Sequence, residues 1–456
     1  MPSATERGAT EIISGWIAAQ SPHRCADLPE AVRNEATRAL LNCLGCSIGG
    51  AGHSARIIWN QVLGESYGPP HATILGTPHR AGVTQAALAN ALSATVDAFC
   101  DTHAEAIIHP SAPVISAALA LAEQRRASGE ALLLAIVLGI EIECRLSKAI
   151  SVSPAHASFG WLQTGIGGGV GAAVAAGSLL GLDARQMAQA IGIAASQAAG
   201  LRISMGTYAT PLVHAQGAET GLRAALLAAA GFTGPENVIE GEFGFAQMFC
   251  AEPALFHLTE GLGDRYELLS LTYKAYPCGI VAHAAIDAAL GLKAKGVDTG
   301  SIERIEARVH PSAVKLTGRQ HPKDSNEAQF SLQHWAAVAL IHGTARVADG
   351  SAARLAEPAV VALRSRVEAI ADPAMASDAA AMTAVLRNGE RIDVSVAHCT
   401  GSAARPMSDV DVETKFRGLA EGQLNGERMD NVISLCRKIV SVADVSTLAA
   451  ACAKAV

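Results

Sequence analysis

The stretch LLLAIVLGIEI, residues 132–142, decides the fold class of this protein. Its apolar residues extend over about three helical turns, without the alternation of polar and apolar residues that marks a half-buried strand. The same helical spacing recurs in residues 86–91 and 114–123. Half of the chain is apolar but only 4% is aromatic, so the interior must consist largely of small and aliphatic side chains, which let helices approach closely. These features predict a large helical part.

The pattern changes near residue 268. Ile305, Ala307 and Val309 alternate with polar residues, as in a half-buried strand, and Asn388-Gly389 lies between residues 384–387 and 391–396, which is a strong hairpin signal. Further helices are expected at 277–296, 328–342, 350–362, 409–421, 428–438 and 444–455. We therefore predict a mainly α-helical protein, in which a large all-helical domain (1–267 and 405–456) carries a smaller α/β domain (268–404) inserted before the C-terminal helices.

Charge and composition argue against two classes of partner. The net charge is −7 and no basic run occurs, so nucleic acid is not an expected partner. Residues 161–182 carry no charge, yet seven of them are glycine, which predicts a buried helix with close neighbours rather than a membrane span. We expect no membrane association.

The cysteines and the N-terminal residues bear on location and metal binding. Glu6, Arg7 and Glu11 interrupt the place where a signal peptide would need an apolar core, and the ten cysteines follow no disulfide framework, so we expect a cytoplasmic protein with reduced thiols. Cys43 and Cys46 form a single close pair, too few ligands for zinc. No metal site is expected.

Two polar segments stand out as candidate sites. The first contains Asp97, Asp101, Thr102, His103, His109 and Ser111. These residues either form a solvated loop or line a cleft, where Ser111 would cap the next helix and the helix N-terminus would offer N–H groups to a carboxylate. The second segment is Tyr273-Lys274, in which a lone lysine among apolar residues could be an anion clamp or a proton donor; the alternative is an exposed lysine in a linking turn. The glycine-rich run 165–171 does not fit a nucleotide-binding motif and is better explained by helix packing.

At these residues the chain resembles the MmgE/PrpD family, which includes 2-methylcitrate dehydratase, cis-aconitate decarboxylase and iminodisuccinate epimerase. The resemblance is carried in order along nearly the whole chain by LLNCLGCSIGG (40–50), DAFCDTHAEAIIHPSAPVISAALALAE (97–123), GLRAALLAAAGFTGPENVIEGEFGF (221–245), YKAYPCGIVAHAAIDAAL (273–290), EAQFSLQHWAAVALIHG (327–343) and GSAARPMSDVDVETKF (401–416).

The resemblance implies a helical and a smaller α/β domain with the active site in the cleft between them, a homodimer, and no metal or organic cofactor. It also implies catalytic roles for His109, Lys274 and the Asp101-Thr102 pair. Four positions depart from the pattern of the lyases. Leu162 stands where these members carry a histidine, Thr210 where they carry a lysine, Val213 where they carry a histidine next to His214, and His334 where tyrosine is common. Asp97 lies one residue too far from Thr102 to match the family's earlier acid.

The expected chemistry is removal of a proton next to a carboxylate of a small di- or tricarboxylate. His109 is the first candidate for the base, with His103, His214 and His334 as alternatives, because the ordinary pKa of histidine lies near neutral pH. Carboxylates would be held by Lys274, Ser111 and Arg202, with Tyr273 and Asp97 as further binding residues. Leu162 and Thr210 favour an epimerase-like reaction on an iminodisuccinate-like substrate. The alternatives are a 2-methylcitrate dehydratase, a cis-aconitate decarboxylase, and a binding protein that has lost catalysis.

Overall fold

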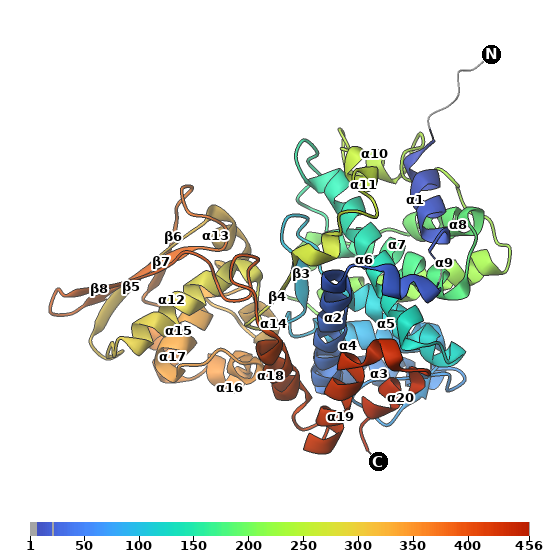
Figure 1. Ribbon diagram of the computed structural model, residues 1–456. Coiled ribbons are helices and arrows are strands. Elements are labelled where there is room, and N and C mark those ends of the chain that lie inside the picture. The colour runs from blue at the N-terminus through green and yellow to red at the C-terminus, as the bar shows by residue number, and fades with distance from the viewer. Residues whose placement is uncertain (1–6, 21, 456) are drawn as a thin grey trace.

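The computed structural model describes residues 7–20 and 22–455, so Glu6 lies outside the described residues. The chain folds mainly into helices, with a smaller sheet-containing part built from residues near the C-terminal side of the sequence (Figure 1). Among the described residues, the helical part contains two hydrophobic clusters, the larger of which includes residues from both ends of the chain, and a third core lies within residues 278–399. The predicted fold class is confirmed, while the exact domain bounds stay a prediction.

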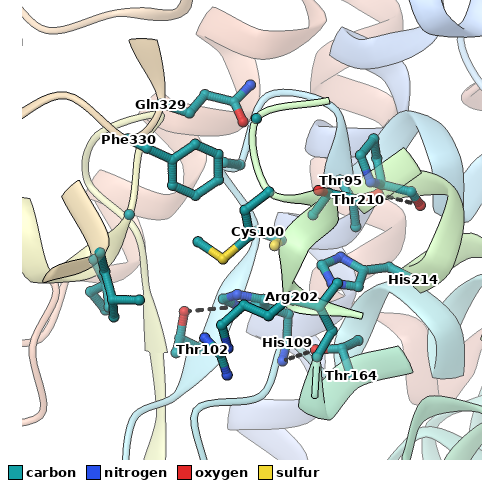
Figure 2. A pocket seen from close by; sticks show the side chains of 18 of the residues that line it. Thr95, Cys100, Thr102, His109, Thr164, Arg202, Thr210, His214, Gln329 and Phe330 are labelled. Carbon is teal, nitrogen blue, oxygen red and sulfur yellow. Dashed lines mark hydrogen bonds between the residues drawn. The ribbon is translucent and has the colours of Figure 1, made fainter. Parts of the chain in front are cut away.

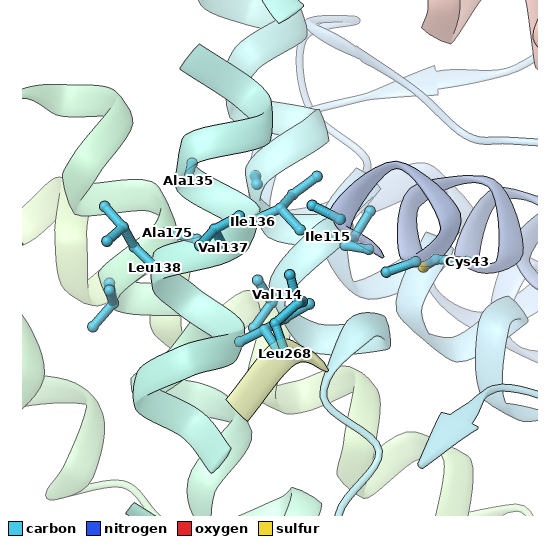
Figure 3. Close-up of a cluster of buried hydrophobic side chains, with 14 of the residues drawn as sticks. Cys43, Val114, Ile115, Ala135, Ile136, Val137, Leu138, Ala175 and Leu268 are labelled. Carbon is cyan, nitrogen blue, oxygen red and sulfur yellow. The ribbon is translucent and has the colours of Figure 1, made fainter. Parts of the chain in front are cut away.

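Helix α6 (Gly129–Ser151) contains the stretch that decides the fold class and passes through the centre of the larger core. Ser128 caps its N-terminus, because the serine side chain accepts a hydrogen bond from the N–H of Ala131. Ile136 and Leu138 are at most 1% exposed and belong to one buried cluster with Val114 and Ala175 (Figure 3). Replacing a leucine buried in this way by alanine typically costs about 2–5 kcal/mol.

The other helices of this part are α1 (Ala9–Ala18), α2 (Glu30–Gly49), α3 (Ser54–Leu63), α4 (Val83–Thr95), α5 (Ser111–Arg125), α7 (Gln163–Leu180), α8 (Ala184–Ala195), α9 (Ala209–Ala229), and the short α10 (Phe245–Phe249) and α11 (Phe256–Thr259). Of these, α2, α5, α7, α10 and α11 contact α6, and the rest pack against these or against one another.

Helix α7 explains the glycine-rich run in the sequence. A Cβ added at Gly171 would lie 2.6 Å from Oε2 of Glu143 on α6, and one added at Gly221 of α9 would lie 2.3 Å from the carbonyl oxygen of Gly169. Neither distance leaves room for a side chain, so the glycines allow α6, α7 and α9 to pack closely. No helix among the described residues is long and apolar enough to cross a membrane.

The smaller part is a four-stranded sheet with helices packed on it (Figure 1). Its strands are β5 (Ile302–Val309), β6 (Val367–Ala371), β7 (Ala380–Leu386) and β8 (Arg391–Val396), in the order β6-β5-β7-β8. The predicted hairpin is present: β7 pairs antiparallel with β8, Ala384 opposite Ile392, and Gly389 has a φ of +86°. The helices are α12 (His283–Ala294), α13 (Pro311–Thr317), α14 (Ser325–Ala328), α15 (Leu332–His342), α16 (Ala352–Leu355) and α17 (Pro358–Arg364).

Three C-terminal helices pack against the helical part. They are α18 (Asp409–Ala420), α19 (Gly426–Arg437) and α20 (Ser446–Ala451). Helix α18 packs on α2, where a Cβ added at Gly45 would lie 3.2 Å from the ring of Phe416. Helix α20 packs against α5.

Several local predictions are wrong in their bounds. The helix expected at 277–296 begins only at His283, because Pro277 and Gly279 lie in a turn. The helix expected at 328–342 is divided around Phe330, and that at 350–362 is divided before Pro358. Strand β6 and two short strand pairs were not expected: β1 (Ala72–Thr73) with β2 (Arg80–Ala81), and β3 (Asp101–His103) with β4 (Leu271–Tyr273). Strands of two or three residues are too short to show a period in the sequence.

Candidate active site

The unexpected pair β3 and β4 brings the two polar segments of the sequence together, between the helical and sheet-containing parts (Figure 1). Asp101 pairs with Tyr273, and the hydroxyl of Thr272 donates a hydrogen bond of 2.8 Å to the carbonyl of Thr102. Lys274 follows β4 directly, so the strand pairing places it beside the segment that contains Thr102.

A cavity opens next to this strand pair and encloses about 1030 Å³ of space, its open mouth included. Five residues expected from the sequence line it: Thr102, His109, Arg202, His214 and Lys274. Leu162 and Thr210, two of the positions that depart from the lyase pattern, line it as well. The cavity therefore brings together five of the expected residues and two of the four positions that depart from the lyase pattern.

His109 is held in a defined orientation (Figure 2). Its Nδ1 lies 2.8 Å from the carbonyl oxygen of Asp101, which can only accept, so Nδ1 carries a proton and donates it to this bond. The hydroxyl of Thr102 lies 3.2 Å from the same nitrogen, and the backbone N–H of His109 donates to Thr164 at 2.9 Å. In the neutral ring, Nε2 is therefore unprotonated and free to exchange a proton with a substrate.

The surroundings of His109 keep it neutral in the absence of ligand. Burial lowers the pKa of His109 well below its usual value, and the positive charge of Lys274 lowers it further. His214 lies next to it, with ring centroids 5.8 Å apart. Burial, together with the charge of Lys274, lowers the pKa of His214 to about 4. Among the described residues no partner meets Nδ1 of His214, so this imidazole is a second polar group without a fixed role in the fold.

Two cations reach the cavity without a carboxylate to balance them. Lys274 is only 3% exposed, and its ammonium has no hydrogen-bond partner among the described residues. Arg202 is fixed by bonds from Nε to the carbonyl of Phe159 (2.6 Å) and from Nη2 to that of Trp161 (3.0 Å). Within the described part of the chain, no aspartate or glutamate lines the cavity. The arrangement can bind an anion and offer it a neutral imidazole.

Asp101 and Ser111 lie behind the cavity wall. Asp101 is fully buried, burial raises its pKa, and its carboxyl accepts a hydrogen bond of 2.7 Å from the Ser111 hydroxyl. Ser111 is thereby occupied and does not cap α5, whose N-terminal residues do not line the cavity. The expectation that this helix N-terminus holds a carboxylate is therefore wrong, and Asp101 acts on the site through its carbonyl contact with His109.

The structure does not bring four other expected residues to the cavity. His103 is buried against Glu267, with Nε2 3.1 Å from the carboxylate, and Tyr273 donates to Glu35 at 2.5 Å. His334 lies on α15 and its Nε2 donates to the carbonyl of Asp349 at 2.9 Å. Burial raises the pKa of Asp97 to about 6, but its side chain is not part of the lining. His103 and His334 are thus structural groups, since packing and hydrogen bonds occupy them away from the cavity.

Several lining residues were missed by sequence reasoning. Gln163 and Thr164 belong to the same short segment as Leu162, and Gln329 and Phe330 belong to the segment that contains His334. Leu162 and His334 had already marked these two segments in the sequence. The segments could therefore be found from the sequence, but not which of their side chains point into the cavity. Among the described residues, no group of three or more histidine, cysteine, aspartate or glutamate side chains is arranged to hold a metal ion.

Lys415 holds the backbone on both sides of the β3–β4 pair from outside the cavity. Its ammonium donates to the carbonyls of Phe99 (2.6 Å) and Lys274 (2.9 Å), so it joins the segment before β3 to the residue after β4. Burial lowers the pKa of this lysine to about 8.

Two family models match most of the chain. Residues 12–256 match the MmgE/PrpD N-terminal domain and residues 276–439 match the MmgE/PrpD C-terminal domain. Cis-aconitate decarboxylase from Homo sapiens is 27% identical over 440 residues, which cover 92% of this chain and 90% of that protein. Cis-aconitate decarboxylase from Aspergillus terreus is 26% identical over 479 residues (98% and 96%), and 2-methylcitrate dehydratase from Cupriavidus necator is 26% identical over 197 residues (40% of each chain). With both domains of the family matched in order, the chain belongs to the MmgE/PrpD family.

Proposed function

We propose that this enzyme is a lyase that removes a carboxylate, as CO2, from a small unsaturated tricarboxylate of the cis-aconitate kind. The observation that carries the proposal is the neutral, oriented imidazole of His109 in a cavity with two unbalanced cations, Lys274 and Arg202. Such a site binds carboxylates and moves a proton next to them.

The reaction assigns each group a task. Lys274 and Arg202 hold two carboxylates of the substrate. Their negative charges offset the cations that lower the pKa of His109, so the bound state favours a protonated imidazole. His109 then donates a proton to one carbon of the double bond. The electron pair of the breaking carbon–carboxylate bond forms a new carbon–carbon double bond, and the carboxylate leaves as CO2. One proton is consumed.

The relatives support the lyase branch better than the epimerase reaction that Leu162 and Thr210 favour. Human and fungal cis-aconitate decarboxylases match this chain over more than nine-tenths of its length. The match to 2-methylcitrate dehydratase supports a second candidate, loss of water. In that reaction His109 would act as a base and take a proton from the carbon next to a carboxylate.

One set of measurements distinguishes these reactions. The purified enzyme is incubated in heavy water with cis-aconitate, 2-methylcitrate and iminodisuccinate, and the products are followed by NMR. We expect CO2 release from cis-aconitate with one deuterium incorporated into the product. Loss of water from 2-methylcitrate alone, or inversion of iminodisuccinate alone, would refute the decarboxylase proposal.

The pH dependence tests the role of His109. As a proton donor it must be protonated in the complex, so kcat should fall as pH rises through the pKa of the complex; a base would give the opposite slope. His109→Gln should lower kcat by about 100-fold or more, whereas His156→Gln, an exposed histidine, should leave it unchanged. Unchanged turnover in His109→Gln would leave a binding role only. The expected homodimer and cytoplasmic location remain predictions from the family resemblance.

A further inference from the structure

The cavity has two chemically different sides. His109, Thr102 and Arg202 lie on one side, and Phe330 lies on the other with Gln329 (Figure 2). Most of the second side comes from the sheet-containing part and is apolar. Its lining includes Ile280, Val281, Leu316 and Phe330, and we call these four residues the apolar wall.

The apolar wall is built from segments that bond to one another. The N–H of Gly279 donates to the carbonyl of Gln329 at 3.0 Å, and the N–H of Arg319 donates to that of Phe330 at 3.1 Å. A further bridge joins Gly318 and Ser331. Because all three of its segments are tied by backbone bonds, the wall is a fixed surface rather than a loose loop.

Among the residues that the structure describes, no lysine or arginine of the wall's segments lines the cavity; Arg319, whose guanidinium lies beside Gly206, forms an ion pair with Glu327 at 3.5 Å. Lys315 is adjacent to Leu316 but directs its ammonium to the ring of Phe159, 4.0 Å from the centroid, and does not line the cavity. Lys274 and Arg202 can balance two carboxylates of a tricarboxylate. The third carboxylate would then meet apolar side chains and the amides of Asn326 and Gln329, and Nε2 of Gln329 is already bonded to the carbonyl of Val96 at 2.7 Å.

A carboxylate pressed against an apolar surface loses hydration that apolar side chains cannot replace, whereas CO2 is neutral and has little hydration to lose. We propose that the apolar wall receives the carboxylate that is lost, and so selects which carbon–carboxylate bond breaks. This inference rests on the proposed decarboxylation. The bond that breaks is the carbon–carboxylate bond whose carboxylate faces the wall. Its electron pair forms the new carbon–carbon double bond. The proton is added to the far carbon of the original double bond, from the opposite side of the cavity, where His109 lies.

A cation placed on the wall tests this role. Leu316→Lys should stabilise the bound carboxylate, so KM for cis-aconitate should fall and kcat should fall by about tenfold or more. Leu269→Lys, which adds the same charge at an exposed leucine outside the cavity lining, should change each constant less than about threefold. Propane-1,2,3-tricarboxylate, which has no double bond and does not react, should bind Leu316→Lys more tightly than wild type in calorimetry. Val281→Lys serves as a second variant if Leu316→Lys does not fold.

Each result has a separate meaning. If wild type releases CO2 and the lysine variants leave kcat unchanged or raise it, the wall does not act on the leaving carboxylate. The inference also fails if wild type releases CO2 faster from dicarboxylates that carry an alkyl group in place of the third carboxylate than from cis-aconitate. In that case the wall binds an apolar substituent of the substrate instead of a carboxylate. If wild type releases no CO2 from any tricarboxylate, the proposed function fails first.

Discussion

Replacing Lys274 by methionine is the sharpest single perturbation of this site. The side chain is almost fully enclosed, lines the cavity and is one of the two cations that can meet a substrate carboxylate. Methionine keeps most of the length of the side chain, one atom short of lysine, and removes its charge. The variant should therefore lose binding of a carboxylate without opening a large space in the protein.

The expected loss follows from the loss of one charge-assisted contact in an enclosed site. Truncating one partner of a buried charged pair costs about 2–5 kcal/mol, which corresponds to a decrease in kcat/KM of about 30- to 4000-fold. A second effect has the opposite sign on the histidines. The charge of Lys274 lowers the pKa of His109 and of His214, so both pKa values should rise in the variant.

The assay combines steady-state kinetics with an NMR titration of the imidazole nitrogens. Lys295→Met is the matched control, since this exposed lysine bonds to the carbonyl of Asp393, far from the cavity lining. The free energy of unfolding should not fall in Lys274→Met, because its ammonium has no partner among the described residues. The reasoning is refuted if kcat/KM changes less than about threefold, or if neither histidine changes its pKa.

Two further predictions concern groups around this lysine. His214 has a pKa of about 4 in the folded state and about 6.5 when unfolded, so the unfolded chain binds its proton first as pH falls, and this histidine should cost up to about 3 kcal/mol of stability between pH 6.5 and 4. In urea unfolding, His214→Gln should therefore show a weaker dependence of stability on pH over that range. The same pH dependence in the variant and in wild type would contradict the assignment. Lys415→Met leaves the carbonyls of Phe99 and Lys274 without their donor, at a cost of about 1–3 kcal/mol of stability for each carbonyl. The variant should lower kcat more than Lys415→Arg does, because arginine can still donate. Equal kcat in both variants and in wild type would show that the orientation of Lys274 does not depend on this contact.

The sequence predicted the helical part well, because residues 132–142 and their neighbours carry a period that only a buried helix explains. It predicted the hairpin for a similar reason, since Asn388-Gly389 fits the turn that joins β7 to β8. The strands β3 and β4 were missed, because their pairing joins residues about 170 positions apart and neither segment has a sequence pattern that identifies the strand it pairs with. That pairing places Lys274 beside His109, so the closeness of the two candidate segments depends on a long-range contact that neither segment reveals by its own residues.

Side-chain direction explains the errors within the site. His103 and His109 are both histidines in one polar segment, yet β3 turns His103 towards Glu267 while His109 faces the cavity. Ser111 is at a position typical of a helix cap, but Asp101 takes its hydroxyl. A residue's type shows which chemistry it can perform, and only the packing around it shows whether that chemistry is already engaged.

The departures from the lyase pattern acquire a physical meaning from their position. Leu162 and Thr210 both line the cavity, so a change from histidine and lysine to neutral side chains removes charge from the cavity itself. Lys274 and Arg202 remain, and they balance one charge fewer than a tricarboxylate carries. An uncompensated carboxylate is a disadvantage for binding but an advantage for a reaction that discharges it as CO2. The altered positions therefore do not by themselves argue against the proposed decarboxylase, because an uncompensated carboxylate raises the free energy of the ground state more than that of the transition state, in which its charge is being lost.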